Sequence, residues 1–262
     1  MTALSVNLNK IAWLRNAREG AQPDIVHAAE TVLGAGAAGL TVHPRPDLRH
    51  IRPADVHALA AVVARHPGIE YNIEGNPFAG PRDNGFPGFD ALIEAARPVQ
   101  VTLVPDDDQQ LTSDHGFDLR GDQSALKACI ERYQALGARV SLFMDPDPDQ
   151  ISRAAALGVE RIELYTGPFA EVVLAQGLDA SASVAIFEQF ATAAAHAQAK
   201  GLAVNAGHDL DLPNLGLFLT IPGISEVSIG HALISRALDV GLHAITAEFK
   251  RITDAATPAI SH

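Results

Sequence analysis

The chain of 262 residues can form one large domain or two small ones, and its net charge of −12 argues against a nucleic-acid partner, because duplex binding needs a basic face. Hydrophobic residues make up 47% and aromatic residues only 5%, a balance that favours helices packed on a parallel sheet. No apolar segment approaches the roughly 20 residues that cross a bilayer, and the N-terminus lacks a signal-peptide pattern, so we expect a soluble, cytoplasmic protein with no membrane partner.

Short apolar runs alternate with segments of helical pattern along the whole chain. The runs predict strands at residues 4–8, 40–42, 69–73, 99–104, 139–144, 161–165, 202–205 and 226–229. The segments between and after them predict helices at 11–18, 24–33, 54–65, 89–96, 124–136, 150–157, 181–200, 213–219 and 232–252. Eight strands, each followed by a helical segment, are typical of an α/β protein with a (β/α)8 TIM barrel; a doubly wound sheet is the alternative.

One segment interrupts this alternation. Residues 76–87 are rich in Gly, Pro and Asn and predict no regular structure, yet the strand and helix pattern resumes in phase after them. We therefore expect a single TIM-barrel domain over residues 1–262, with a loop insertion at 76–87 that acts as a mobile loop or lid.

In a barrel, chemistry concentrates where the strands end and the following loops begin. The predicted strand ends carry Asn7, His43, Glu74, Asp145, His208 and Gly230. The stretch 43–50 holds two imidazoles, which can move protons near neutral pH, and two guanidiniums, which can bind phosphate through paired donors. It is either an active-site loop for an anionic substrate or a polar surface loop.

Two acids, Glu70 and Glu163, fall within predicted apolar strands. A carboxylate that points into a barrel is costly unless it is paired or used, and burial can raise its pKa into the range of a general acid or base. The alternative for each is an outward side chain in a salt bridge. Glu160 and Glu226 lie at strand starts, at the end of the barrel where residues are expected to contribute to stability and not to chemistry.

The last two strand ends suggest an anion site. His208 ends the seventh strand, and Gly230-His231 ends the eighth directly before a helix, whose N-terminal amides can bind phosphate. Glycines that serve only as tight turns are the alternative. No His or carboxylate spacing matches a metal motif, so we expect no metal and no cofactor, and Cys129, the one cysteine, is expected in the core.

Five stretches together resemble pyridoxine 5′-phosphate synthase. They are VNLNKIAWLRNAR (6–18), TVHPRPDLRHI (41–51), VSLFMD (140–145), VNAGH (204–208) and IGHALISRA (229–237). The resemblance covers essentially the whole chain in order. It implies a TIM barrel assembled as a homo-octamer, a tetramer of dimers, that condenses 1-deoxy-D-xylulose 5-phosphate with 3-amino-2-oxopropyl phosphate to give pyridoxine 5′-phosphate, phosphate and water.

The resemblance also implies roles for individual residues. His43 and Glu70 correspond to proton acceptors, His208 to a proton donor, and Glu163 to a carboxylate that stabilises charge in the transition state. The residues implied in holding the deoxyxylulose phosphate are Arg45, His50 and Thr112. Those implied in holding the aminoketone phosphate are Asn7, Arg18, Gly230 and His231.

Three features depart from the family pattern. Asn9-Lys10 stands where the familiar form has Asp-His, so a point charge replaces a titrating ring; both residues are still expected to bind substrate, and a Schiff-base role for Lys10 is the alternative. Asp209 replaces a glycine at a substrate-binding position, and its charge would weaken phosphate binding unless it turns away. The insertion at 76–87 is the third. Another phosphosugar aldolase or isomerase, or a barrel that binds phosphometabolites without turnover, are the competing hypotheses.

Overall fold

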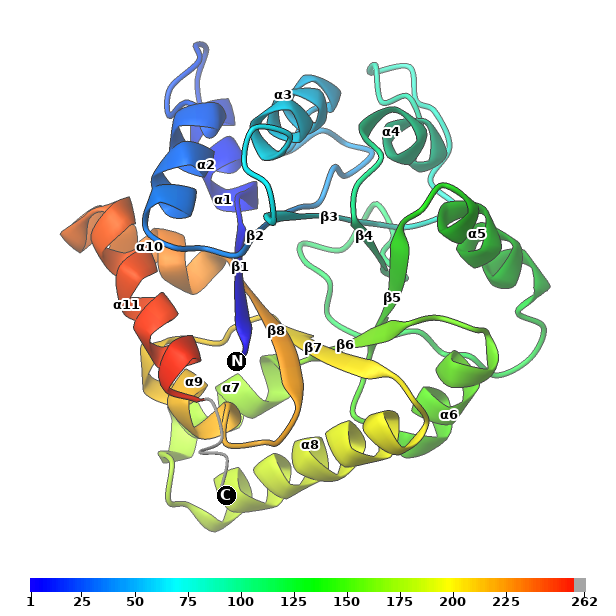
Figure 1. Ribbon diagram of the computed structural model, residues 1–262, viewed down its shortest axis with the longest axis vertical. Helices are drawn as coiled ribbons and strands as arrows, with labels where there is room; N and C mark the ends of the chain where they lie inside the picture. Colours follow the sequence, from blue (N-terminus) through cyan, green and yellow to red (C-terminus); the bar gives the residue numbers. More distant parts are fainter. Residues whose placement is uncertain (257–262) are drawn as a thin grey trace.

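A closed barrel of parallel strands forms the centre of the molecule (Figure 1). The structure is a computed structural model that describes residues 1–256, so the last six residues of the expected domain lie outside the described part. Each strand pairs with the next along the chain, and β8 pairs with β1. The strands are β1 (Ala3–Asn7), β2 (Gly39–Val42), β3 (Glu70–Gly75), β4 (Gln100–Leu103), β5 (Arg139–Met144), β6 (Arg161–Tyr165), β7 (Ala203–Gly207) and β8 (Ile224–Ile229). The predicted TIM barrel is confirmed.

Helices surround the barrel on all sides (Figure 1). They are α1 (Asn9–Asn16), α2 (Ile25–Gly34), α3 (Pro53–Val63), α4 (Phe89–Ala96), α5 (Ser124–Ala135), α6 (Pro148–Ala156), α7 (Gly167–Gln176), α8 (Ser181–Ala199), α9 (Leu212–Phe218), α10 (His231–Val240) and α11 (Leu242–Ala255). Several begin as their sequence predicts: the Asp24 side chain accepts a hydrogen bond from the His27 amide at 2.8 Å, which caps α2.

Two helical predictions were wrong. Helix α7 was missed, because Gly167-Pro168 looks like a helix breaker; proline in the first turn instead has a φ suited to a helix start and lacks only an amide that would be unpaired there. The last helix, predicted as one piece over 232–252, is two helices. Gly241 has φ +87°, a left-handed conformation that ends α10 and turns the chain into α11.

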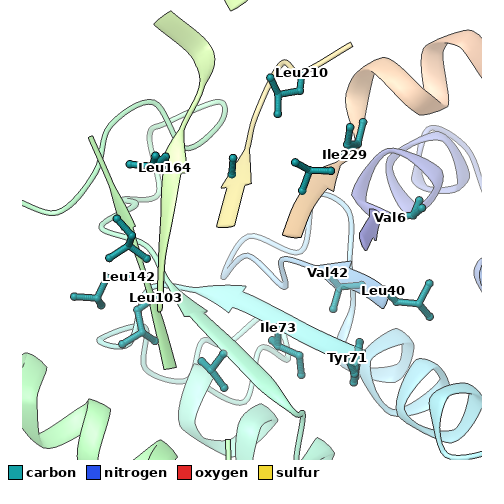
Figure 2. Close-up of a cluster of buried hydrophobic side chains, with 14 of the residues drawn as sticks. Val6, Leu40, Val42, Tyr71, Ile73, Leu103, Leu142, Leu164, Leu210 and Ile229 are labelled. Carbon is teal, nitrogen blue, oxygen red and sulfur yellow. The ribbon is translucent and has the colours of Figure 1, made fainter. Parts of the chain in front are cut away.

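The two faces of the barrel wall differ in chemistry. Apolar side chains such as Val6, Leu40 and Ile73 are fully buried in the hydrophobic core (Figure 2). Polar side chains occupy the interior instead: Gln100 of β4 donates a hydrogen bond to Glu226 of β8 at 3.3 Å, although these strands lie on opposite sides of the barrel. The interior is therefore filled by buried polar side chains that are hydrogen-bonded to one another beneath the rim.

The segment 76–87 packs against neighbouring loops. Asn76 donates to the Asp106 carbonyl at 2.7 Å, Asn84 donates to the Pro46 carbonyl at 2.8 Å, and Arg82 pairs with Asp108 at 2.9 Å. These contacts join the loops that follow β2, β3 and β4. Whether the segment moves as a lid stays a prediction.

Candidate active site

A cavity of about 270 Å³ opens at the end of the barrel where the strands finish. Residues from β1, β3, β6 and β8, the loops after β2, β4, β7 and β8, and the starts of α1 and α10 converge on it. Its lining residues are Asn7, Asn9, Lys10, Trp13, His43, Arg45, His50, Glu74, Leu111, Thr112, Ser113, Glu163, His208, Asp209, Ser228, Gly230 and His231. Every site residue predicted from the sequence is among them except Glu70 and Arg18.

Glu70 does not reach the cavity. It is the first residue of β3, at the opposite end of the strand from the rim, and its half-buried carboxylate pairs with Arg139 at the start of β5. The expectation of a catalytic Glu70 was therefore wrong. Glu74, four residues further along the same strand, lies at the rim with its side chain 9% exposed and lines the cavity.

Arg18, which was expected to bind phosphate, also lies outside the cavity. Helix α1 ends at Asn16, so Arg18 lies in the exposed turn beyond it. The nearby Arg15 is buried and donates two hydrogen bonds to Asp55, at 2.5 and 2.8 Å. Arg15 is thus structural, and Arg18 does not line the cavity within this chain.

His43 lies between two carboxylates. Its Nδ1 is 4.0 Å from Glu74 Oε2, and its Nε2 is 3.8 Å from Asp106 Oδ2. Its backbone amide donates to Asn9 Oδ1 at 2.8 Å, which fixes the residue at the end of β2. Burial, and then Arg45, lower the pKa of His43 well below its usual range, so the ring is neutral at neutral pH and has a free nitrogen lone pair that can accept a proton.

The pKa of Glu74 moves in the other direction. Burial raises it well above the usual value, and the neighbouring carboxylates of Glu163 and Asp106 raise it further. A raised pKa is typical of carboxyl groups that take part in proton transfer. His43 and Glu74 therefore place two titratable groups side by side at the rim.

Glu163 of β6 is the deepest carboxylate of the cavity. It is 1% exposed, and its Oε2 has no hydrogen-bond partner within residues 1–256. Burial, and then Glu226, raise the pKa of Glu163 to about 8. Gly207 makes room for this side chain, because a Cβ atom at Gly207 would lie 2.2 Å from Glu163 Oε1.

His208 is held at the end of β7 by aromatic contacts and by its backbone. Its ring centroid lies 5.1 Å from that of Phe143 and 5.5 Å from that of Tyr165, and Thr166 Oγ1 donates to its carbonyl. Burial is the main cause that lowers the pKa of His208 to about 4, while Asp209 raises it. His208 and Asp209 have φ of +78° and +59°, strained values that often mark functional sites.

One wall of the cavity is cationic. His50 accepts a hydrogen bond at Nδ1 from the Ile51 amide at 2.9 Å, which leaves Nε2 as a donor, and burial with Arg45 lowers its pKa to about 3. Arg45 is buried with its side chain 4% exposed, and Lys10 Nζ lies 4.4 Å above the Trp13 ring. Together with Thr112, these donors can bind a phosphate group.

Another wall of the cavity is the N-terminus of α10. Gly230 precedes this helix, and His231 is its first residue. A Cβ atom at Gly230 would lie 3.0 Å from Asn7 Cβ, so glycine allows the close approach of the two strand ends. Unpaired amides at a helix start can bind an anion, so this wall can hold a second phosphate group.

Five lining residues were not predicted, and the reasons differ. Glu74 stood at a predicted strand end, and that position was the signal that should have outweighed Glu70. Trp13 and Ser228 follow from the helical and strand patterns only once the register is known. Leu111 and Ser113 lie in a long loop whose path the sequence does not determine. Within residues 1–256, no group of His, Cys, Asp or Glu side chains could hold a metal ion, and no helix is long and apolar enough to cross a membrane.

Comparison with known protein families shows which family has this sequence. The family model described as pyridoxal phosphate biosynthesis protein PdxJ matches residues 4–255. The chain belongs to this family. It is 57% identical over 244 residues to the pyridoxine 5′-phosphate synthase of Xanthomonas axonopodis pv. citri (strain 306), covering 93% of each chain. It is 53% identical over 261 residues to the same-named protein of Xylella fastidiosa (strain 9a5c), covering 99% of this chain and 98% of that one.

Solved structures of other families share the barrel alone. Phosphoribosylanthranilate isomerase from Thermotoga maritima aligns with a TM-score of 0.54 at 10% identity, over 97% of this chain and all of that one. D-psicose 3-epimerase from Clostridium cellulolyticum H10 aligns with a TM-score of 0.56 at 13% identity, over 98% of this chain and all of that one. At such identities the likeness concerns the fold.

Proposed function

We propose that this PdxJ-family chain condenses 1-deoxy-D-xylulose 5-phosphate with 3-amino-2-oxopropyl phosphate to form pyridoxine 5′-phosphate, with release of phosphate and water, in vitamin B6 biosynthesis. One observation carries the proposal: a single cavity is lined by groups that can bind anions, from the loop after β2 and from the start of α10, and by buried acids and bases. Two phosphorylated substrates that must react with one another need this arrangement, because each phosphate then fixes one reactant against the other.

The phosphate sites differ in kind. Arg45, His50 and Thr112 supply side-chain donors, and we assign the deoxyxylulose phosphate to them. Gly230 and His231 supply the start of α10, with Asn7 beside it, and we assign the aminoketone phosphate to these residues. Lys10 lies on the cationic wall and adds a point charge, while Asn9 positions His43 through its amide.

The steps between the two phosphates are proton transfers. Imine formation, dehydration, loss of phosphate and ring closure each move a proton at carbon or oxygen. We assign proton acceptance to His43 and to Glu74, which takes the role expected of Glu70. His208 donates a proton, and Glu163 stabilises the charge that develops in the transition state.

The state of His208 in the free protein requires a change on substrate binding. With its pKa lowered to about 4, the ring is neutral at neutral pH. A bound phosphate dianion near the ring favours the imidazolium and raises that pKa, so His208 becomes a proton donor when the cavity is occupied. Substrate binding and donor activation are thereby coupled.

Assembly and location complete the proposal. We infer a cytoplasmic homo-octamer, a tetramer of dimers, because the family resemblance implies it. The exposed position of Arg18 fits a residue that does not act on the cavity of its own chain. Mass measurement of the native protein by light scattering tests the octamer.

The decisive assay mixes both substrates with the purified protein and follows the pyridoxine chromophore and free phosphate. We expect both products in equal amounts, and no product from either substrate alone. Turnover of one substrate without the other would favour an aldolase or isomerase, and binding without turnover would favour an inactive barrel.

A further inference from the structure

Asp106 is a buried carboxylate in the loop between β4 and α5 that does not line the main cavity. Its side chain is 5% exposed, and its Oδ2 accepts hydrogen bonds from Arg45 Nη2 and, at 2.8 Å, from Ser113 Oγ. The same oxygen lies 3.8 Å from His43 Nε2. Asp106 therefore contacts a residue that we assign to phosphate binding and lies beside one that we assign to proton transfer.

The loop that carries Asp106 holds the guanidinium of Arg45 from one side. Arg45 Nη1 donates to the Gln110 carbonyl at 3.0 Å and to the Asp107 carbonyl at 3.5 Å, while Nη2 donates to Asp106. Of these three acceptors, only Asp106 carries charge. A charged hydrogen bond in a buried place is stronger and more directional than a neutral one, so Asp106 sets the plane of the guanidinium.

A purely structural explanation accounts poorly for this carboxylate. Burying a carboxylate is costly unless its oxygens are satisfied, yet Oδ1 of Asp106 has no hydrogen-bond partner within residues 1–256. Two independent contacts hold the residue there: Ser113 fixes its side chain, and Asn76 donates to its backbone carbonyl at 2.7 Å. The fold thus maintains an incompletely paired charge next to Arg45.

We propose that Asp106 is a positioning residue for phosphate binding, which acts through Arg45 and does not touch the substrate. The inference rests on the proposed function only in its choice of ligand, 1-deoxy-D-xylulose 5-phosphate. Arg45 lines the cavity, and with Asp106 in place its guanidinium keeps one fixed plane, in which the N–H groups that Asp106, Asp107 and Gln110 do not use remain available to a phosphate. Without it, the guanidinium keeps two carbonyl acceptors and loses its fixed plane.

A competing role makes the opposite prediction. If Asp106 competed with the phosphate for Arg45, its removal would tighten substrate binding. We expect weaker binding, because the Arg45 side chain is only 4% exposed and its bidentate contact with a phosphate depends on the orientation of the guanidinium.

The test is equilibrium binding of 1-deoxy-D-xylulose 5-phosphate alone, by titration calorimetry, to the full chain and its variants. Asp106→Asn keeps the shape and removes the charge, and we expect its Kd to rise about tenfold. Asp118→Asn, a matched change in the same loop, removes a carboxylate that is 58% exposed and pairs with Arg120, and we expect it to change Kd less than twofold.

A double-mutant cycle shows whether the effect passes through Arg45. In an Arg45→Gln background, we expect Asp106→Asn to change Kd less than twofold, because there is no guanidinium left to orient. An unchanged or lower Kd for Asp106→Asn in the native background would overturn the proposal. So would a tenfold effect that persists in the Arg45→Gln background.

Two further measurements keep the outcome clear. If Asp106→Asn does not fold, as judged by its circular dichroism and thermal transition, Ser113→Ala loosens the same carboxylate and is expected to raise Kd about threefold; no change would contradict the proposal. Binding of one substrate needs no turnover, so an inactive wild-type protein would refute the proposed synthase while leaving this test intact.

Discussion

Glu70 and Glu74 are two acids of the same strand that we expect to have different roles, one in stability and one in proton transfer. They lie four residues apart on β3, about 13 Å along the strand, and side chains at this spacing share one face of a strand. They differ in their position along the strand: Glu74 is at the rim, 4.0 Å from His43, and Glu70 is at the far end, where it pairs with Arg139. Replacing each by glutamine therefore makes the same chemical change at two ends of one strand.

The two substitutions are expected to lower kcat by very different factors. A general acid or base contributes about 10²–10⁴-fold to a rate, so we expect Glu74→Gln to lower kcat by at least a hundredfold with little change in substrate affinity. The Glu70 side chain is 34% exposed, and a solvent-screened ion pair contributes about 1 kcal/mol or less, so Glu70→Gln should lower stability slightly and kcat less than threefold.

Steady-state product formation, with circular dichroism as a check on folding, measures both variants side by side. An equal loss of kcat in the two variants would refute the argument that position along the strand decides the role. A native kcat in Glu74→Gln would remove this carboxylate from the proposed proton transfers.

Three other predictions concern His208 and the two buried acids Glu163 and Glu226. Asp209→Asn removes a charge that favours the His208 imidazolium, so the pKa of His208 should fall below about 4 in an NMR titration, and a rise would contradict the assigned contact. Gly207→Ala places a methyl group against Glu163 and should lower kcat at least tenfold, whereas Gly216→Ala, which meets open space, should not. Burial raises the pKa of Glu226 from 4.5 to about 7, so the folded protein binds an extra proton in this range and loses stability as the pH rises through it. Glu226→Gln should therefore be more stable than the native protein by about 3 kcal/mol at pH 9 and nearly equal to it at pH 5. A stability difference that is independent of pH in denaturant unfolding would contradict this prediction.

Sequence reasoning recovers the barrel because each strand is a short apolar run between punctuating residues. It also recovers the residues that end strands, since His43, His208 and Gly230 follow their strands directly. Its error at Glu70 comes from weighing an acid inside an apolar run above the rule that chemistry lies at the strand end, where Glu74 stood.

Contacts between loops could not be predicted in the same way. Asp106 comes before a long segment without periodicity, and its partners Arg45 and Asn76 are 61 and 30 residues away in the chain. Helix boundaries failed for a local reason: Gly241 can lie within a helix or end one, and only its φ of +87° in the folded chain decides between them.

The most direct test of the central claim is a crystal structure of the protein with pyridoxine 5′-phosphate and inorganic phosphate bound together. We predict two phosphorus positions in one cavity, one within hydrogen-bond distance of Arg45 and His50, and the other at the start of α10 beside Gly230. A single phosphate position, or a product phosphate bound outside this cavity, would contradict the account.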